Sequence, residues 1–110
     1  MGDNIFLKII RHEVPANIRF EDDEIIVFDD VNPKAKIHLL VVPKKPLASL
    51  AESSEDDQAL LGKLLYRVKL MADESGLKDG YRTVINTGSD GGQEVPQLHI
   101  HLLGGEKLDV

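Results

Sequence analysis

Two of the four histidines in this 110-residue chain, His99 and His101, stand two positions apart near its C-terminal end. Gln97 precedes them at the same spacing, and apolar residues alternate with all three. Successive side chains of a β-strand point to opposite faces. The alternation therefore predicts that Gln97, His99 and His101 share one face of a strand, while the apolar residues between them point into a core.

Neighbouring imidazoles on one strand face suit chemistry at phosphorus. A neutral imidazole can attack a phosphorus atom in line and form a covalent nucleotidyl-histidine. A second imidazole, with a pKa near neutrality, can donate a proton to a phosphate oxygen or a leaving group. Two other interpretations of the motif remain open: a solvated strand face, or a metal site in which His38 or Asp30 supplies a third ligand.

Two short segments could assist such chemistry. Residues 88–92 contain three glycines and directly precede the histidine segment, and backbone N–H groups of a glycine turn can converge on a phosphate. Asp29 and Asp30 follow an apolar segment, and a carboxylate accepts hydrogen bonds from vicinal ribose hydroxyls. An ordinary hairpin loop and ordinary turn aspartates are the alternatives.

The elements that must position these residues follow from periodicity and breakers. A short amphipathic helix is predicted over 4–12 and a long one over 54–75, with Ser54 as its N-cap and Gly76 as its stop. Strands are predicted over 18–20, 24–28, 37–42, 81–86 and 98–103. Short connections favour a mostly antiparallel sheet with helices on one face, which is an α+β domain.

Composition excludes several classes of function. Thirteen basic against nineteen acidic residues give a net charge of −6, which argues against a general nucleic-acid binder. The absence of cysteine excludes disulfides and thiolate chemistry. No apolar run approaches the roughly 18 residues of a membrane helix, and the N-terminal residues do not form a signal peptide. We expect one cytoplasmic domain over residues 1–110.

Together these pieces resemble the histidine-triad (HIT) family, and within it the Hint branch of purine nucleoside phosphoramidases. The matching segments keep the branch's order and spacing over nearly the whole chain. They are Ile5-Phe6-Leu7-Lys8-Ile9-Ile10, Phe28-Asp29-Asp30-Val31-Asn32-Pro33, His38-Leu39-Leu40-Val41-Val42-Pro43-Lys44, Gly80-Tyr81-Arg82, Asn86, Gly91-Gly92-Gln93-Glu94-Val95 and His99-Ile100-His101-Leu102-Leu103-Gly104-Gly105.

The resemblance implies a fold, an assembly and a set of site residues. The fold is a five-stranded antiparallel sheet with two helices, joined across a homodimer into one continuous sheet. His99 matches the nucleophile, His101 the histidine that contacts the phosphate and aids the leaving group, and His38 a further histidine near the triad. The nucleotide-binding positions are Asp30 for the ribose, Ile5, Phe6, Ile9, Phe28 and Val31 for the base, and Asn86, Gly92, Gln93, Glu94 and Val95 near the phosphate.

This chain departs from the family pattern at two places. Gln97 occupies the first triad position, where the family has histidine, and an amide can hydrogen-bond but cannot titrate. If the first position only orients its neighbours, activity survives; if it carries protons, turnover suffers. The chain ends at Val110, whereas a longer tail in the Hint branch often tunes substrate choice, so the leaving group stays open.

The resemblance therefore implies a phosphoramidase or nucleotidyl hydrolase that releases a purine nucleoside monophosphate such as AMP and needs no cofactor or metal. A dinucleoside polyphosphate hydrolase of the same superfamily is one alternative. A nucleotide-binding regulatory module, impaired by Gln97, is the other. Neither nucleic acid nor a membrane is an expected partner.

Overall fold

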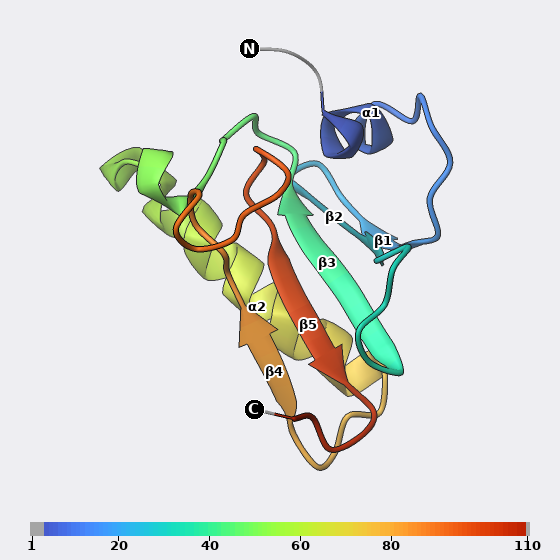
Figure 1. Cartoon of the computed structure of the whole chain (residues 1–110). Coiled ribbons are helices and arrows are strands. Elements are labelled where there is room, and N and C mark those ends of the chain that lie inside the picture. Colours follow the sequence, from blue (N-terminus) through green and yellow to red (C-terminus); the bar gives the residue numbers. More distant parts are fainter. Residues whose placement is uncertain (1–3, 110) are drawn as a thin grey trace.

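The computed structural model describes residues 4–109 and contains one five-stranded antiparallel sheet (Figure 1). Its helices and strands are α1 (Ile5–Ile10), β1 (Ile18–Glu21), β2 (Ile25–Asp29), β3 (Ile37–Pro43), α2 (Gln58–Glu74), β4 (Tyr81–Val84) and β5 (Ile100–Gly104), and the strand order is β1-β2-β3-β5-β4. Two short 3-10 turns, Leu50–Glu52 and Glu55–Asp57, precede α2. The α+β class and the five antiparallel strands are confirmed. The first residues of the segment examined for a signal peptide, 1–3, lie outside the described part.

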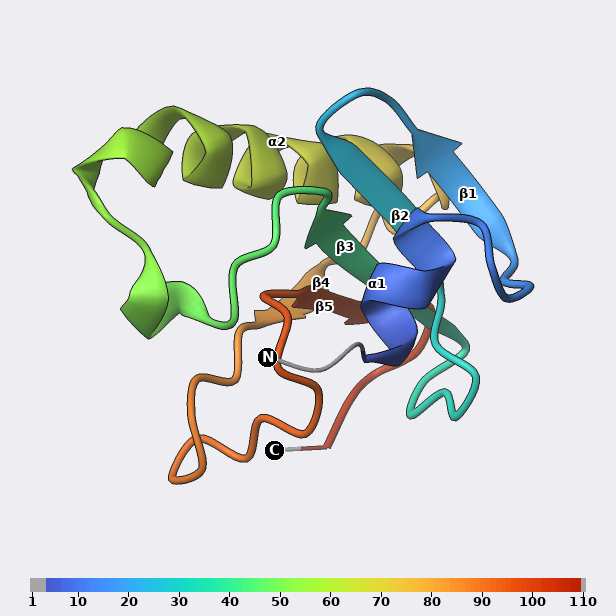
Figure 2. The same ribbon diagram turned by 90° about the horizontal axis from the view of Figure 1, so that it is seen from above.

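The two helices lie on opposite faces of the sheet (Figure 2), so the prediction that both pack on one face is wrong. The reason is that the central strands are buried on both sides. Along β2, Ile25 and Val27 face α2, whereas Ile26 and Phe28 face α1. Burial on both faces produces a continuous apolar run rather than an alternating one, and such a run requires a second layer of cover.

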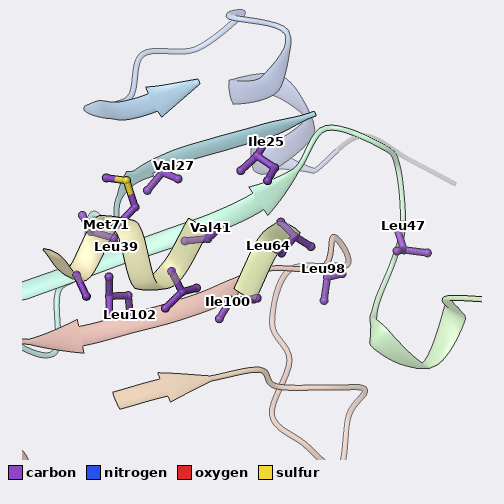
Figure 3. Close-up of a cluster of buried hydrophobic side chains, with 12 residues drawn as sticks. Ile25, Val27, Leu39, Val41, Leu47, Leu64, Met71, Leu98, Ile100 and Leu102 are labelled. Carbon is purple, nitrogen blue, oxygen red and sulfur yellow. The ribbon is translucent and has the colours of Figure 1, made fainter. Parts of the chain in front are cut away.

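The larger of the two cores lies between the sheet and α2 (Figure 3). Its strand residues include Val27, Leu39, Val41, Ile100 and Leu102, and α2 contributes its apolar stripe. The fully buried members of that stripe are Leu64, Val68, Met71 and Ala72. The apolar residues that alternate with the triad positions, Leu98, Ile100 and Leu102, all belong to this core, as the alternation predicted.

The long helix begins three residues later than its N-cap suggested. Ser54 forms a capping box with Asp57, but the box starts the 3-10 turn Glu55–Asp57, and regular α-helix begins at Gln58. Gly76, with a φ of +72°, ends the helix as predicted. In the described residues 4–109, no helix combines the length and the apolar character needed to cross a bilayer.

Strand β5 is shorter at its start than the sequence indicated. It begins at Ile100 instead of Leu98, so His99 and Gln97 precede the regular ladder. Within the ladder Leu40 pairs with His101. His38 lies two residues before Leu40, which makes His38 and His101 diagonal neighbours on the face that α1 covers. Antiparallel register thus brings together two histidines that are 63 positions apart.

Candidate active site

A cavity of about 780 Å³ opens on the α1 side of the sheet. It is lined from α1, the ends of β2 and β3, the strands β4 and β5, and the loop before β5. The predicted site residues that line it are Ile5, Phe6, Ile9, Phe28, Asp30, Val31, His38, Asn86, Gly92, Glu94, Val95, His99 and His101. Gln93 and Gln97 are the predicted site residues that do not.

His99 is held in one orientation and one tautomer. Its Nδ1 lies 2.7 Å from the backbone oxygen of Gln97, and because a carbonyl only accepts, Nδ1 must carry the proton. The ring is 6% exposed and packs edge-on against Phe6, with centroids 4.9 Å apart. In the neutral ring the lone pair is therefore on Nε2, the nitrogen that a nucleophile needs.

His101 is oriented by a chain of hydrogen bonds that starts at the backbone. The N–H of Lys34 donates to His38 Nδ1 at 3.0 Å, so a neutral His38 carries its proton on Nε2. That nitrogen lies 2.9 Å from His101 Nδ1, which then acts as the acceptor. A neutral His101 consequently carries its proton on Nε2 and can donate it to a ligand.

The three imidazoles of the site are neutral near pH 7. Burial lowers the pKa of His99 and of His38 below the ordinary value of 6.5. Burial, followed by the neighbouring His99 and His38, lowers the pKa of His101 to about 4. A neutral imidazole has a free lone pair, so the low pKa values keep His99 available as a nucleophile at physiological pH.

Three side chains of the site lie close enough together to bind a metal ion, but the hydrogen bonding of one of them, His38, disfavours metal binding. Nitrogen or oxygen atoms of Asp30, His38 and His101 lie within 4.8 Å of one another. A metal on His38 Nε2 would require the proton on Nδ1, where it would oppose the N–H of Lys34. His99, which the metal interpretation of the sequence included, is not in this group. The chemistry of the donor set favours a proton-ordered chain over a metal centre.

Asp30 lies at the polar edge of the cavity. Its Oδ1 accepts from the N–H of Asn32 at 2.8 Å, and its Oδ2 is 3.4 Å from His38 Nε2. The side chain is 19% exposed, so lone pairs remain accessible to hydroxyl groups. Val31, predicted as an apolar wall for the base, lines the cavity but is 88% exposed.

Part of the cavity lining is apolar. Phe6 and Phe28 meet edge to face with centroids 5.4 Å apart, and Ile9 and Val95 belong to the same cluster. α1 is positioned there because its buried residues, Phe6 and Ile9, cover β2 and β3. A flat aromatic group would find apolar walls here, with His99, which packs against Phe6, directly beside them.

Hydrogen bonds within the glycine turn occupy some of the N–H groups that were expected to contact a phosphate. Gly92 N–H donates to Ser89 O and Gln93 N–H to Gly88 O, and the Asn86 amide donates to Gly91 O at 2.8 Å. Among residues 4–109, the N–H of Glu94 has no acceptor within the chain. Of the predicted backbone donors Gly92, Gln93 and Glu94, the last is thus the one left available.

Sequence reasoning proposed no site role for nine residues that line the cavity: Val14, Pro15, Ala16, Asn32, Lys34, Leu40, Arg82, Val84 and Leu103. Lys34 acts through its backbone N–H, and Lys34 and Arg82 are the cationic side chains that line the cavity. Leu40 also lines it. Arg82 and Leu40 stand in segments that carry the family resemblance, Gly80-Tyr81-Arg82 and residues 38–44, whereas Lys34 lies outside every matched segment. A backbone donor has no signature in the sequence.

The histidine pKa values give a direct test of the site. We expect NMR titration to place the pKa of His101 near 4 and those of His99 and His38 below 6.5. The unfolded chain binds these protons more readily than the folded one between about pH 6.5 and pH 4. The free energy of unfolding should therefore fall as the pH is lowered through this window. A His101 pKa at or above 6.5 would contradict the assignment.

Comparisons with known proteins show the family of this chain. Residues 11–108 match the HIT domain family. An uncharacterized HIT-like protein of Synechococcus elongatus is 58% identical over 106 residues, 96% of this chain and 93% of that protein. Two solved structures superpose closely. A HIT family hydrolase from Legionella pneumophila gives a TM-score of 0.94 at 44% identity, covering 97% of this chain and 96% of the other.

The second is a histidine triad protein from Clostridium difficile, with a TM-score of 0.95 at 40% identity, covering 100% of this chain and 96% of the other. The family match spans nearly the whole chain, and the similarity extends from sequence to three-dimensional structure. This chain belongs to the HIT domain family.

Proposed function

We propose that this protein is a cytoplasmic hydrolase of the Hint type, a single nucleotide-binding domain that releases a purine nucleoside monophosphate from a phosphoramidate. One observation carries the proposal: His99 presents Nε2 as a lone pair while the neighbouring His101 presents Nε2 as a donor. The description of the Legionella relative as a HIT family hydrolase supports hydrolysis. The phosphorus–nitrogen bond is the part that rests on the Hint resemblance.

The bound nucleotide would occupy both ends of the cavity. The purine would lie against Phe6 and Phe28, and Asp30 would accept hydrogen bonds from the ribose hydroxyls. The phosphate would then reach His99, His101 and the N–H of Glu94. Lys34 and Arg82, which line the same cavity, supply positive charge for an anionic ligand in a protein whose net charge is −6.

In the first step, His99 Nε2 attacks the α-phosphorus and forms a phosphorus–nitrogen bond to the ring. The bond to the amine breaks, and the amine takes up a proton from solvent and leaves. His101 Nε2–H donates to a phosphate oxygen, where negative charge builds up. In the second step, water attacks the phosphorus and returns a proton to solvent. The ring nitrogen is released, and the nucleoside monophosphate is the product.

Replacement of the nucleophile tests this mechanism. His99→Ala should abolish release of AMP from an adenosine phosphoramidate, with AMP affinity by calorimetry within a few-fold of wild type. A matched control is His12→Ala, because His12 is an exposed histidine that pairs with Glu21 outside the cavity. Turnover should also resist a chelator.

The other outcomes separate the alternatives. Substantial turnover by His99→Ala contradicts the nucleophile, and chelator-sensitive turnover indicates a metal enzyme. Faster cleavage of a diadenosine polyphosphate than of the phosphoramidate indicates the related polyphosphate hydrolase. AMP binding by wild type without any turnover or trapped intermediate indicates a binding module.

The proposed contact of Asp30 with the ribose can be tested with two ligands that differ only in their ribose hydroxyls. Loss of hydrogen bonds to a charged group costs about 1.5–3 kcal/mol, which corresponds to roughly 10- to 100-fold in affinity. Asp30→Ala should weaken AMP binding by that factor, yet bind 2′,3′-dideoxy-AMP as well as wild type does. Equal weakening for both ligands would show that Asp30 acts through His38 instead of the ribose.

We further propose that two copies associate through β4 and α2. Strand β4 is an edge of the sheet, and an edge presents unpaired backbone groups. Leu65 and Tyr66 on α2 and Tyr81 on β4 are large apolar side chains that remain exposed. Light scattering should give twice the 12.2 kDa mass of the chain. A single-chain mass at micromolar concentration would contradict the dimer and leave the chemistry untouched.

A further inference from the structure

The side chain of Gln97 is joined to the backbone that follows β3. Its Oε1 accepts from the N–H of Leu47 at 3.1 Å, and its Nε2 donates to the oxygens of Pro43 and Lys45 at 3.0 and 2.9 Å. Gln97 is 1% exposed and does not line the active-site cavity. The amide therefore makes three hydrogen bonds within the protein and has no access to a substrate.

The backbone of Gln97 makes a further contact, with the ring of His99. Its carbonyl oxygen is the acceptor for His99 Nδ1 at 2.7 Å. The next residue, Leu98, is tied to the same backbone, because its N–H donates to Leu47 O at 2.7 Å. The side chain of Gln97 is thus hydrogen-bonded to residues 43–47, and its backbone carbonyl is hydrogen-bonded to the ring of His99.

Glutamine fits this position better than histidine does. Residues 43–47 offer Gln97 two acceptors and one donor, so its side chain must supply two donors and one acceptor at once. A neutral imidazole supplies one of each, an imidazolium two donors without an acceptor, and a carboxylate acceptors alone. A buried carbonyl left without a partner is costly, which makes the amide the side chain that satisfies all three groups without titrating.

We propose that Gln97 is a positioning residue, which holds its own carbonyl, and through it the tautomer and orientation of His99, in a way that does not change with pH. The inference concerns how the site is built and rests on the proposed function only for its kinetic consequence. It predicts that the protein is active with glutamine at the first triad position and that histidine at this position does not raise kcat.

The test compares Gln97→Glu, Gln97→His and Gln58→Glu with the wild type. Gln97→Glu keeps the shape; its carboxylate donates to neither carbonyl oxygen, and its protonated form donates to only one of the two. Gln58→Glu is the matched control, because Gln58 is exposed at the start of α2 and outside the site. Circular dichroism checks folding, and 15N NMR of the imidazoles reports which nitrogen of His99 carries the proton. Phosphoramidate turnover and AMP calorimetry complete the set.

A misplaced reacting group can cost on the order of 100-fold in rate. We expect Gln97→Glu to lower kcat by about 10- to 100-fold, with AMP affinity within a few-fold and the His99 proton no longer confined to Nδ1. Gln97→His should not exceed wild-type kcat, and its kcat should gain a dependence on the titration of the new imidazole. Gln58→Glu should match wild type in every measurement.

Two results would overturn the inference. One is a tenfold or greater rise in kcat for Gln97→His, which would show that the native site lacks a proton carrier. The other is unchanged kcat and an unchanged His99 tautomer in folded Gln97→Glu. If Gln97→Glu does not fold, Gln97→Met, which keeps the length without polar atoms, takes its place with the same expected loss. The NMR reading needs no substrate, so it decides the positioning role even if wild type shows no turnover.

Discussion

The hydrogen bond between His99 Nδ1 and the carbonyl of Gln97 is the interaction on which the site depends. It assigns the proton of the ring to Nδ1 and leaves Nε2 with the free lone pair that the proposed nucleophile needs. The bond can do so only while its carbonyl is fixed, and the carbonyl is fixed because the Gln97 amide is bonded to the backbone of residues 43–47. The orientation of the His99 ring is thereby tied to the end of the central strand β3, of which all residues but Ile37 are buried.

A second series of hydrogen bonds sets the proton position of His101. Lys34, His38 and His101 form a series in which every hydrogen bond dictates the next proton position. Burial keeps the imidazoles neutral by disfavouring their charged forms, and their closeness lowers the pKa of His101 further. The result is two neutral rings with opposite roles: His99 Nε2 has a free lone pair, and His101 Nε2 carries a proton that it can donate. The proposed attack on phosphorus needs the first, and stabilisation of the developing charge needs the second.

The two-sided burial of the sheet explains why a cavity exists at all. α2 covers one face with a continuous apolar stripe. On the other face, the six-residue α1 covers only β2 and part of β3. The rest of that face carries His38 and His101, which line the cavity together with His99, whose ring packs against Phe6 of α1.

The sequence by itself determined the five strands, the two helices, the core role of Leu98, Ile100 and Leu102, and the pairing of His99 with His101 on one face. Each follows from local periodicity, which the chain carries in its spacing. Only the tertiary structure decided that α1 lies opposite α2, because an amphipathic helix specifies that one face is buried and not which side of a sheet buries it. It likewise decided that Gln97 turns away from the cavity, that Lys34 directs His38, and that register sets His38 beside His101. The Gln97 and Lys34 contacts use backbone groups, which nearly every residue carries, and the His38–His101 contact depends on the pairing of strands far apart in the chain, so local periodicity does not reveal them.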